Sequence, residues 1–236
     1  MRLLKQCFRK ESYPSSIYPI ATVQHGHTLN YPQEHALEVL CLPGVPSGTR
    51  YTALTSSNPS PYLITYEFPN LSYITSPDFQ VVMNRELPQS LIDRIYAHTS
   101  FDIRFYSEIA PPAELTKDKS TSTLASITFS PSPAKDSDFK IWFAGKFVLD
   151  LRTSKDFVRV RRFEFVNGVV MERNAVNVEE KPKFLALLEI ENSGEDGRGE
   201  FQDVFESQGL ADVQVEWYEV KKEWKEGEVK KAGEAP

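Results

Sequence analysis

Apolar residues recur along this chain in short blocks that alternate between the spacing of strands and the spacing of helices. The first half of the chain holds six such blocks in the order β-α-β-β-α-β. They are the predicted strands 17–23, 48–54, 62–68 and 101–109 and the predicted helices 32–42 and 76–83. Pro43 disfavours helical geometry in the residue before it, so we expect the first helix to end by Leu42.

The same order of elements returns after a polar, Pro-rich stretch at 111–122. The second set comprises the predicted strands 124–129, 158–166, 184–190 and 213–220 and the predicted helices 137–151 and 200–206. The sequence GTRY at 48–51 has its echo in VRRFEF at 160–165, and YLITYEF at 62–68 has its echo in FLALLEI at 184–190. The chain therefore reads as two copies of one unit.

This order of elements predicts an α+β fold of two ferredoxin-like β-α-β-β-α-β repeats. Each repeat would form a four-stranded antiparallel sheet with helices on one face, and two separate sheets would pack face to face to bury their bare faces. We expect a pseudo-dimeric α/β barrel. Its predicted parts are a flexible arm at 1–16, repeat one at 17–110, a linker at 111–122, repeat two at 123–221 and a loose charged tail at 222–236.

The register of the first hairpin follows from its turn residues. If Asn58 and Pro59 mark the centre of the turn, Arg50 lies opposite Glu67. The second copy would repeat this pair as Arg162 and Glu189. Both pairs could be structural ion pairs.

Composition narrows the class of partner. The chain has 236 residues, of which 40% are hydrophobic, and its net charge of −6 comes without any long basic run, which argues against a nucleic-acid partner. Two cysteines give no disulfide framework, and no apolar run approaches the roughly 20 residues of a membrane span. We expect a cytoplasmic protein that does not bind membranes.

With both units laid out, the chain resembles the dimeric α/β-barrel superfamily, and most closely its EthD-like members. The resemblance rests on the residues Tyr31, Glu34-His35, Pro43-Gly44, Thr49-Arg50-Tyr51, the strand 62–68 and the strand that ends at Tyr106. It implies a fused pseudo-dimer with pockets between the sheet and the helices of a unit. Similar proteins include polyketide cyclases of secondary metabolism, lactone isomerases, decarboxylases and quinone-forming monooxygenases.

His35 is the candidate general base, because it lies on a helix predicted to face the sheet and titrates near neutral pH. Glu34 is the candidate for orienting it, and Arg50 could hold a carboxylate or an enolate. The residues that could position a substrate are Tyr31, Tyr51, Tyr66, Tyr106 and His27. In the second copy Lys146 and Phe147 replace the Glu-His pair, so we expect at most one active site per chain.

The sequence therefore predicts a cofactor-free enzyme that uses a histidine base for cyclisation, dehydration, isomerisation or decarboxylation of a small, apolar, oxygenated substrate. The alternative is a ligand-binding or structural α/β-barrel protein without activity. A metal site at His25, His27 and His35 is a further, weaker alternative, and the expected site contains no metal. The protein would be a monomeric pseudo-dimer or a homodimer of such barrels.

Overall fold

A computed structural model gives the architecture of the chain. It describes residues 17–24, 39–42, 45–68, 70–83, 89–91, 93, 100–109, 113–114, 121–131, 136–154, 156–172, 175–177, 182–191, 198–208 and 210–225. The predicted arm at 1–16, most of the predicted helix at 32–42 and the end of the predicted tail lie outside these residues.

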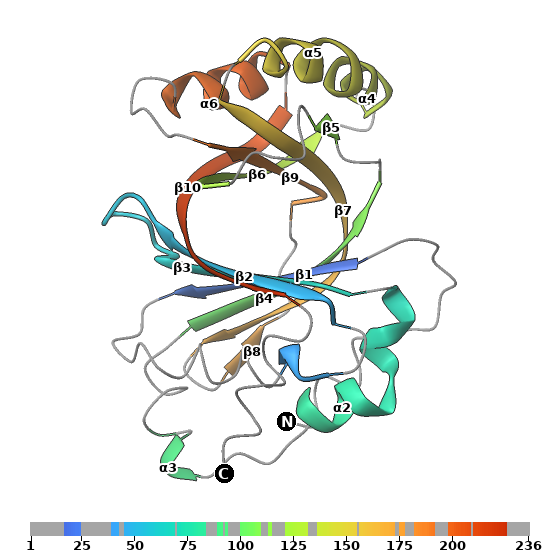
Figure 1. Ribbon diagram of the computed structural model, residues 1–236, viewed down its shortest axis with the longest axis vertical. Coiled ribbons are helices and arrows are strands. Elements are labelled where there is room, and N and C mark those ends of the chain that lie inside the picture. The colour runs from blue at the N-terminus through green and yellow to red at the C-terminus, as the bar shows by residue number, and fades with distance from the viewer. Residues whose placement is uncertain are drawn as a thin grey trace.

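The strands form one antiparallel sheet that closes into a barrel (Figure 1). Their bounds are β1 (Ile17–Gln24), β2 (Ser47–Ala53), β3 (Tyr62–Glu67), β4 (Ser100–Glu108), β5 (Ala113–Glu114), β6 (Thr123–Pro131), β7 (Phe157–Glu172), β8 (Ala175–Asn177), β9 (Phe184–Ile190) and β10 (Leu210–Lys225). The order around the barrel is β4-β1-β3-β2-β10-β6-β9-β7, and pairing of β4 with β7 closes the ring. Short strands β5 and β8 pair with β7.

The closed ring corrects the expectation of two separate sheets stacked face to face. The first four long strands and the last four are joined edge to edge, by β2 with β10 and by β4 with β7. Unpaired backbone groups on an edge strand favour such pairing, which leaves no open edge among the strands of the ring. The apolar faces still meet, but as the two sides of one barrel interior.

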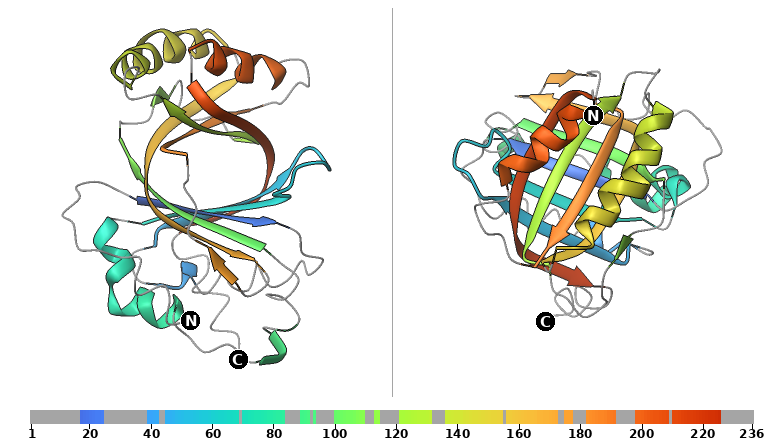
Figure 2. Two further views of the ribbon diagram at one scale, coloured as in Figure 1. Left: turned by 180° about the vertical axis from the view of Figure 1, so that it is seen from behind. Right: turned by 90° about the horizontal axis from the view of Figure 1, so that it is seen from above.

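Helices cover the outside of the barrel (Figures 1 and 2). Within the described residues they are the 3₁₀-helix η2 (Leu71–Thr75), α2 (Pro77–Met83), α3 (Gln89–Leu91), α4 (Asp136–Trp142), the π-helix η5 (Phe143–Phe147), α5 (Val148–Leu151) and α6 (Arg198–Ser207). Seen from above, α4 to α6 lie across strands β6, β7, β9 and β10 (Figure 2). The predicted helices at 76–83, 137–151 and 200–206 are confirmed, with a π-helical turn inside the second of them.

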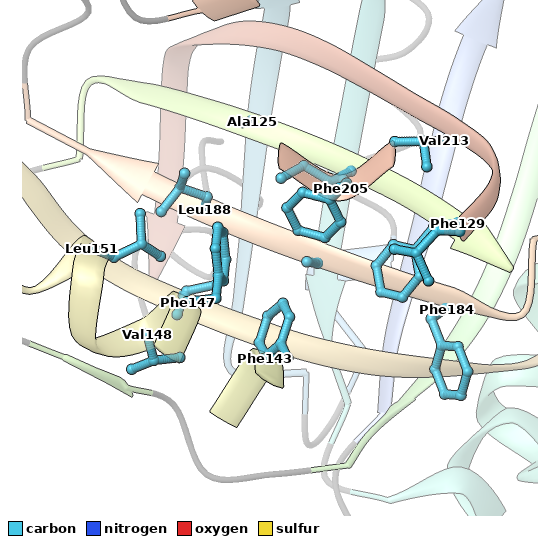
Figure 3. Close-up of a cluster of buried hydrophobic side chains, with 14 of the residues drawn as sticks. Ala125, Phe129, Phe143, Phe147, Val148, Leu151, Phe184, Leu188, Phe205 and Val213 are labelled. Carbon is cyan, nitrogen blue, oxygen red and sulfur yellow. The ribbon is translucent and has the colours of Figure 1, made fainter. Parts of the chain in front are cut away.

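Alternation along the strands divides the buried residues into three layers. One layer fills the barrel interior and includes Tyr51, Leu63, Tyr106 and Tyr218. A second lies on the outer face of the first-half strands. The third lies between α4–α6 and the second-half strands, where the rings of Phe143, Phe147 and Phe205 converge (Figure 3).

The hairpin register differs from the prediction by three residues. Arg50 lies opposite Ile64, and Glu67 lies opposite Ser47. The turn is not centred on Asn58 and Pro59, because Asn58 accepts the Ser60 N–H within a longer loop. Three is an odd number, so the shift places Arg50 and Glu67 on opposite faces of the sheet. The predicted Arg50–Glu67 ion pair is wrong.

The same correction applies in the second hairpin. Glu189 lies opposite Arg159, whereas Arg162 lies opposite Ala186. The predicted Arg162–Glu189 pair is therefore wrong as well.

Two predicted boundaries also change. Residues 113–114 of the predicted linker form β5, and residues 222–225 of the predicted tail belong to β10. The strand pattern continues there because Lys222 and Trp224 pair with β2.

Gly168 stands at the seam where β7 pairs with β4. A Cβ at this position would lie 2.8 Å from the Ile103 carbonyl oxygen, a backbone atom that cannot move alone. We expect Gly168→Ala to lower the free energy of unfolding by about 2–3 kcal/mol, which is typical of overpacking. The measurement is urea unfolding.

Gly145→Ala is the matched control, because nothing lies within 4 Å of its Cβ position in the π-helix. Alanine there should stabilise by up to about 1 kcal/mol through helix propensity. Equal effects of the two substitutions would contradict the packing at the seam.

Candidate functional site

The structure separates the predicted site residues that it describes into two groups. Arg50 and Tyr66 lie on the outer, helix-covered face of the sheet, since their strand partners Ile64 and Gly48 lie there. Tyr51 and Tyr106 face the barrel interior. The four residues therefore do not form one site.

Strand β2 lies between β3 and β10, so each outward-facing residue of β2 has one neighbour on β10 and one on β3. In one row Trp224 and Tyr66 flank Gly48, and in the next Lys222 and Ile64 flank Arg50. We call this set of residues from three strands the outer-face site: Gly48, Arg50, Tyr66, Lys222 and Trp224. It combines two cations with two polar aromatic side chains.

Gly48 lets a helical segment approach the sheet closely. A Cβ on Gly48 would lie 3.0 Å from Leu40 Cδ2 and 3.1 Å from Tyr66 Cδ1. Val39 and Leu40 are buried in the same cluster as Tyr66 and Trp224. The end of the predicted 32–42 helix thus packs on this site, as the sequence predicted for the helix that carries His35.

Two features of the outer-face site favour an oxygen-bearing ligand. Trp224 is only 3% exposed, and its indole Nε1 has no hydrogen-bond partner among the residues that the structure describes. Burial strongly raises the pKa of Tyr66, which therefore stays a neutral phenol at physiological pH. The Lys222 ammonium lies 5.3 Å from the centre of the Trp224 ring.

The barrel interior holds a network of charges. Glu189 accepts two 2.9 Å hydrogen bonds from Arg159 Nη2 and one of 2.8 Å from Thr121. Arg161 Nη2 lies 3.5 Å from Glu189, and its Nη1 donates a 3.0 Å bond to Glu67. Burial raises the pKa of nearby Tyr51 to about 12, and the Glu189 charge adds to this effect. These contacts indicate a structural role.

A second polar group in the interior lies on β4 and β10. Arg104 forms an ion pair with buried Asp102, and Tyr218 donates a 2.9 Å hydrogen bond to Glu216. Burial alone would lower the pKa of Arg104, but the hydrogen bonds that Arg104 donates to the Asp102 carboxylate outweigh this effect, so the net shift of the pKa is upward. Burial raises the pKa values of Glu216, Tyr106 and Tyr218. Arg104 Nη1 also donates a 3.5 Å hydrogen bond to the Tyr106 hydroxyl.

Aromatic rings form most of the packing on the corresponding outer face of the second half. Phe143 and Phe147 lie 5.1 Å apart between ring centres, and the Phe147 ring lies 5.0 Å from that of Phe205 (Figure 3). Phe147 is buried and Lys146 is exposed. The ring of Trp142 lies 5.1 Å from that of Phe147.

The remaining predicted site residues lie outside the described residues. They are His25, His27, Tyr31, Glu34 and His35. The assignment of His35 as base therefore stays a prediction, and so does the histidine metal site. The part of the chain that the structure describes contains no group of three metal-ligating side chains. None of its helices has the length and apolar character needed to cross a membrane.

Sequence reasoning missed Lys222 and Trp224, because the charged stretch from 222 was taken as a tail. The available signal was the alternation of VQVEWYEVKKEWK, which carries a strand pattern as far as Trp224. One bulge, between Val220 and Lys222, interrupts the pairing with β2 and obscures the period.

Comparison with known proteins supports the fold. No family model matches the chain, and no curated protein matches it in sequence. An anthrone oxidase-like protein matches with a TM-score of 0.58 at 8% identity, covering 92% of this chain and 95% of its own. A proposed monooxygenase of Fusobacterium nucleatum matches with a TM-score of 0.56 at 11% identity, covering 92% and 97%.

A proposed monooxygenase from Lactobacillus acidophilus matches with a TM-score of 0.53 at 7% identity, covering 91% of this chain and 98% of its own. Identities this low establish shared architecture and nothing finer. The chain therefore shares with these proteins an α+β architecture in which helices cover a curled antiparallel sheet.

Proposed function

We propose that this chain is a small-molecule enzyme that stabilises an oxyanion of an apolar, oxygenated substrate at the outer-face site. The observation that carries this proposal is the pairing of Arg50 directly opposite Lys222. Two cationic side chains on neighbouring positions of one sheet face attract an anionic group of a substrate, which can bind to both of them.

The site offers the groups that such an anion requires. Arg50 and Lys222 provide positive charge, the free Trp224 N–H provides a donor, and neutral Tyr66 provides a phenol. Donors arranged in advance around a developing oxyanion contribute about 10²–10³-fold to a rate each. His35 is the proposed base, oriented by Glu34, with Tyr31 and His27 as proposed substrate contacts.

An enolate or phenolate is common to several reactions. Cyclisation, dehydration, isomerisation and β-keto acid decarboxylation can all pass through one, as proposed for EthD-like proteins. The names of the structural neighbours, an anthrone oxidase-like protein and proposed monooxygenases, favour oxidation. In that reaction a CH₂ group and O₂ give a carbonyl group and water, after the base has removed one C–H proton and left its electron pair on the substrate.

The barrel itself is proposed to derive from two fused ferredoxin-like units. The orders β4-β1-β3-β2 and β10-β6-β9-β7 correspond, and so do the registers. Arg50 pairs with Ile64 as Arg162 pairs with Ala186. Where the two halves join, Tyr218 pairs with Ala53 on one side of the barrel and Tyr106 pairs with Phe165 on the other. Tyr218 follows Tyr106 by 112 positions in the sequence, and Phe165 follows Ala53 by the same number.

Oxygen uptake with anthrone tests the proposed function. Anthrone is the compound in the name of one structural neighbour, and its CH₂ group beside an aromatic ketone suits the proposed step. We expect catalysed O₂ consumption with formation of anthraquinone, above the rate in buffer, and a loss of about 10²–10⁴-fold in His35→Ala.

Each failure in this experiment has a definite meaning. Unchanged turnover in His35→Ala would remove the base assignment. Saturable anthrone binding without O₂ uptake would overturn oxidation and favour the ligand-binding alternative.

A further inference from the structure

The second half carries a buried arginine whose charge is poorly matched. Arg162 is 9% exposed, and within the described part of the chain its buried Nε and Nη1 atoms have no hydrogen-bond partner. A guanidinium group remains charged in proteins, and an uncompensated buried charge costs several kcal/mol. Buried polar atoms without partners often mark a missing ion or ligand.

The groups around Arg162 do not supply that partner. Its guanidinium carbon lies 5.1 Å from the centre of the Phe143 ring, a cation–π contact. Asp136 attracts the Arg162 guanidinium electrostatically, but its Oδ2 lies 2.7 Å from Lys140 Nζ and its Oδ1 lies 3.8 Å from Lys183 Nζ. Lys183 also lies 3.9 Å from Glu164. Among the described residues, this group contains three cations (Arg162, Lys140 and Lys183) and two carboxylates (Asp136 and Glu164).

The helix above this arginine is irregular. Phe143 begins the π-helix η5, which interrupts the α-helical run from Asp136 to Leu151. π-helical turns are rare and frequently accompany functional sites. This turn places the Phe143 ring on the guanidinium.

We propose that the second half binds a small carboxylate at Arg162, between η5 and β7. The anion would accept hydrogen bonds from the guanidinium atoms that lack partners, with Phe143 packing beside it. This site is separate from the outer-face site and does not depend on the function proposed there. The second half would then be a binding unit, although it lacks the Glu-His pair.

Thermal unfolding in acetate, benzoate and chloride of equal ionic strength tests this site. We expect acetate or benzoate at ten times its Kd to raise the Tm of the wild-type chain by about 3–6 °C relative to chloride. Benzoate alone would identify an aromatic carboxylate, and acetate would show that the carboxylate suffices. Arg162→Met should lose the shift, whereas the exposed Arg152→Met should keep it.

Arg162→Met should also unfold in chloride at a Tm no lower than that of the wild type, because it removes an unpaired buried charge. A lower Tm in chloride would indicate a purely structural arginine and overturn the proposal. So would equal carboxylate shifts in Arg162→Met and wild type, or a wild-type shift no larger than in chloride.

A measurement on the wild-type chain tests the site even if the Arg162→Met variant does not fold. In nitrogen-15 NMR, the Arg162 Nε–H resonance should move as benzoate or acetate is added. A resonance that stays in place up to saturating anion would overturn the site.

Discussion

Glu189→Gln is expected to lower the free energy of unfolding by about 3–5 kcal/mol, the usual cost of breaking a buried ion pair by removing one partner. The Glu189 side chain is 5% exposed, and so is that of Arg161, which it holds at 3.5 Å. A glutamine has the same shape but turns a donor amide toward two arginines. Arg161 would keep its ion pair with Glu67.

Chemical unfolding followed by circular dichroism measures this effect. Glu219→Gln is the matched control, because Glu219 is exposed and pairs with Lys221 at the surface, where such a pair is worth about 0–1 kcal/mol. A loss below about 1 kcal/mol in Glu189→Gln would show that the network is not needed for stability.

A double variant separates two effects of losing Glu189: the buried charge left on Arg161 and the lost contact between the two side chains. Replacing Arg161 by Met together with Glu189 by Leu removes both buried charges. We expect it to be more stable than the sum of the two single losses predicts, because coupled neighbours do not add. Additive losses would mean that the two side chains act independently.

Arg50→Met is expected to lower kcat/KM for anthrone by about 10²–10³-fold if the outer-face site stabilises an oxyanion. Methionine keeps much of the length of the side chain but removes its charge. Arg50 is only partly buried, so we expect the variant to keep its fold. Steady-state O₂ uptake measures the rate, and circular dichroism checks the fold.

Arg152→Met is the control for a general loss of positive charge, since Arg152 is exposed beyond α5. It should retain full turnover. Turnover within about threefold of wild type in Arg50→Met would remove Arg50 from the proposed machinery.

The order and character of the elements could be predicted from the sequence alone. Alternating apolar residues marked the eight long strands, and helical spacing marked the segments that became α2, α4 to α5 and α6. The correspondence of Arg50 with Arg162 and of Tyr106 with Tyr218 was also visible, because the two halves keep a similar pattern. These features are local, since each depends on the sequence of one segment.

The register and the partner of each strand required the tertiary structure. Alternation tells which residues share a face, but a shift of three residues in one turn moved Arg50 to the helix side and left Glu67 inside. Arg161 then met Glu67, from a strand 94 positions away in the chain. Closure through β2–β10 also decided that Trp224 belongs to a site in the first half. Such contacts depend on the three-dimensional balance of backbone pairing and burial around the whole ring, which no single segment encodes.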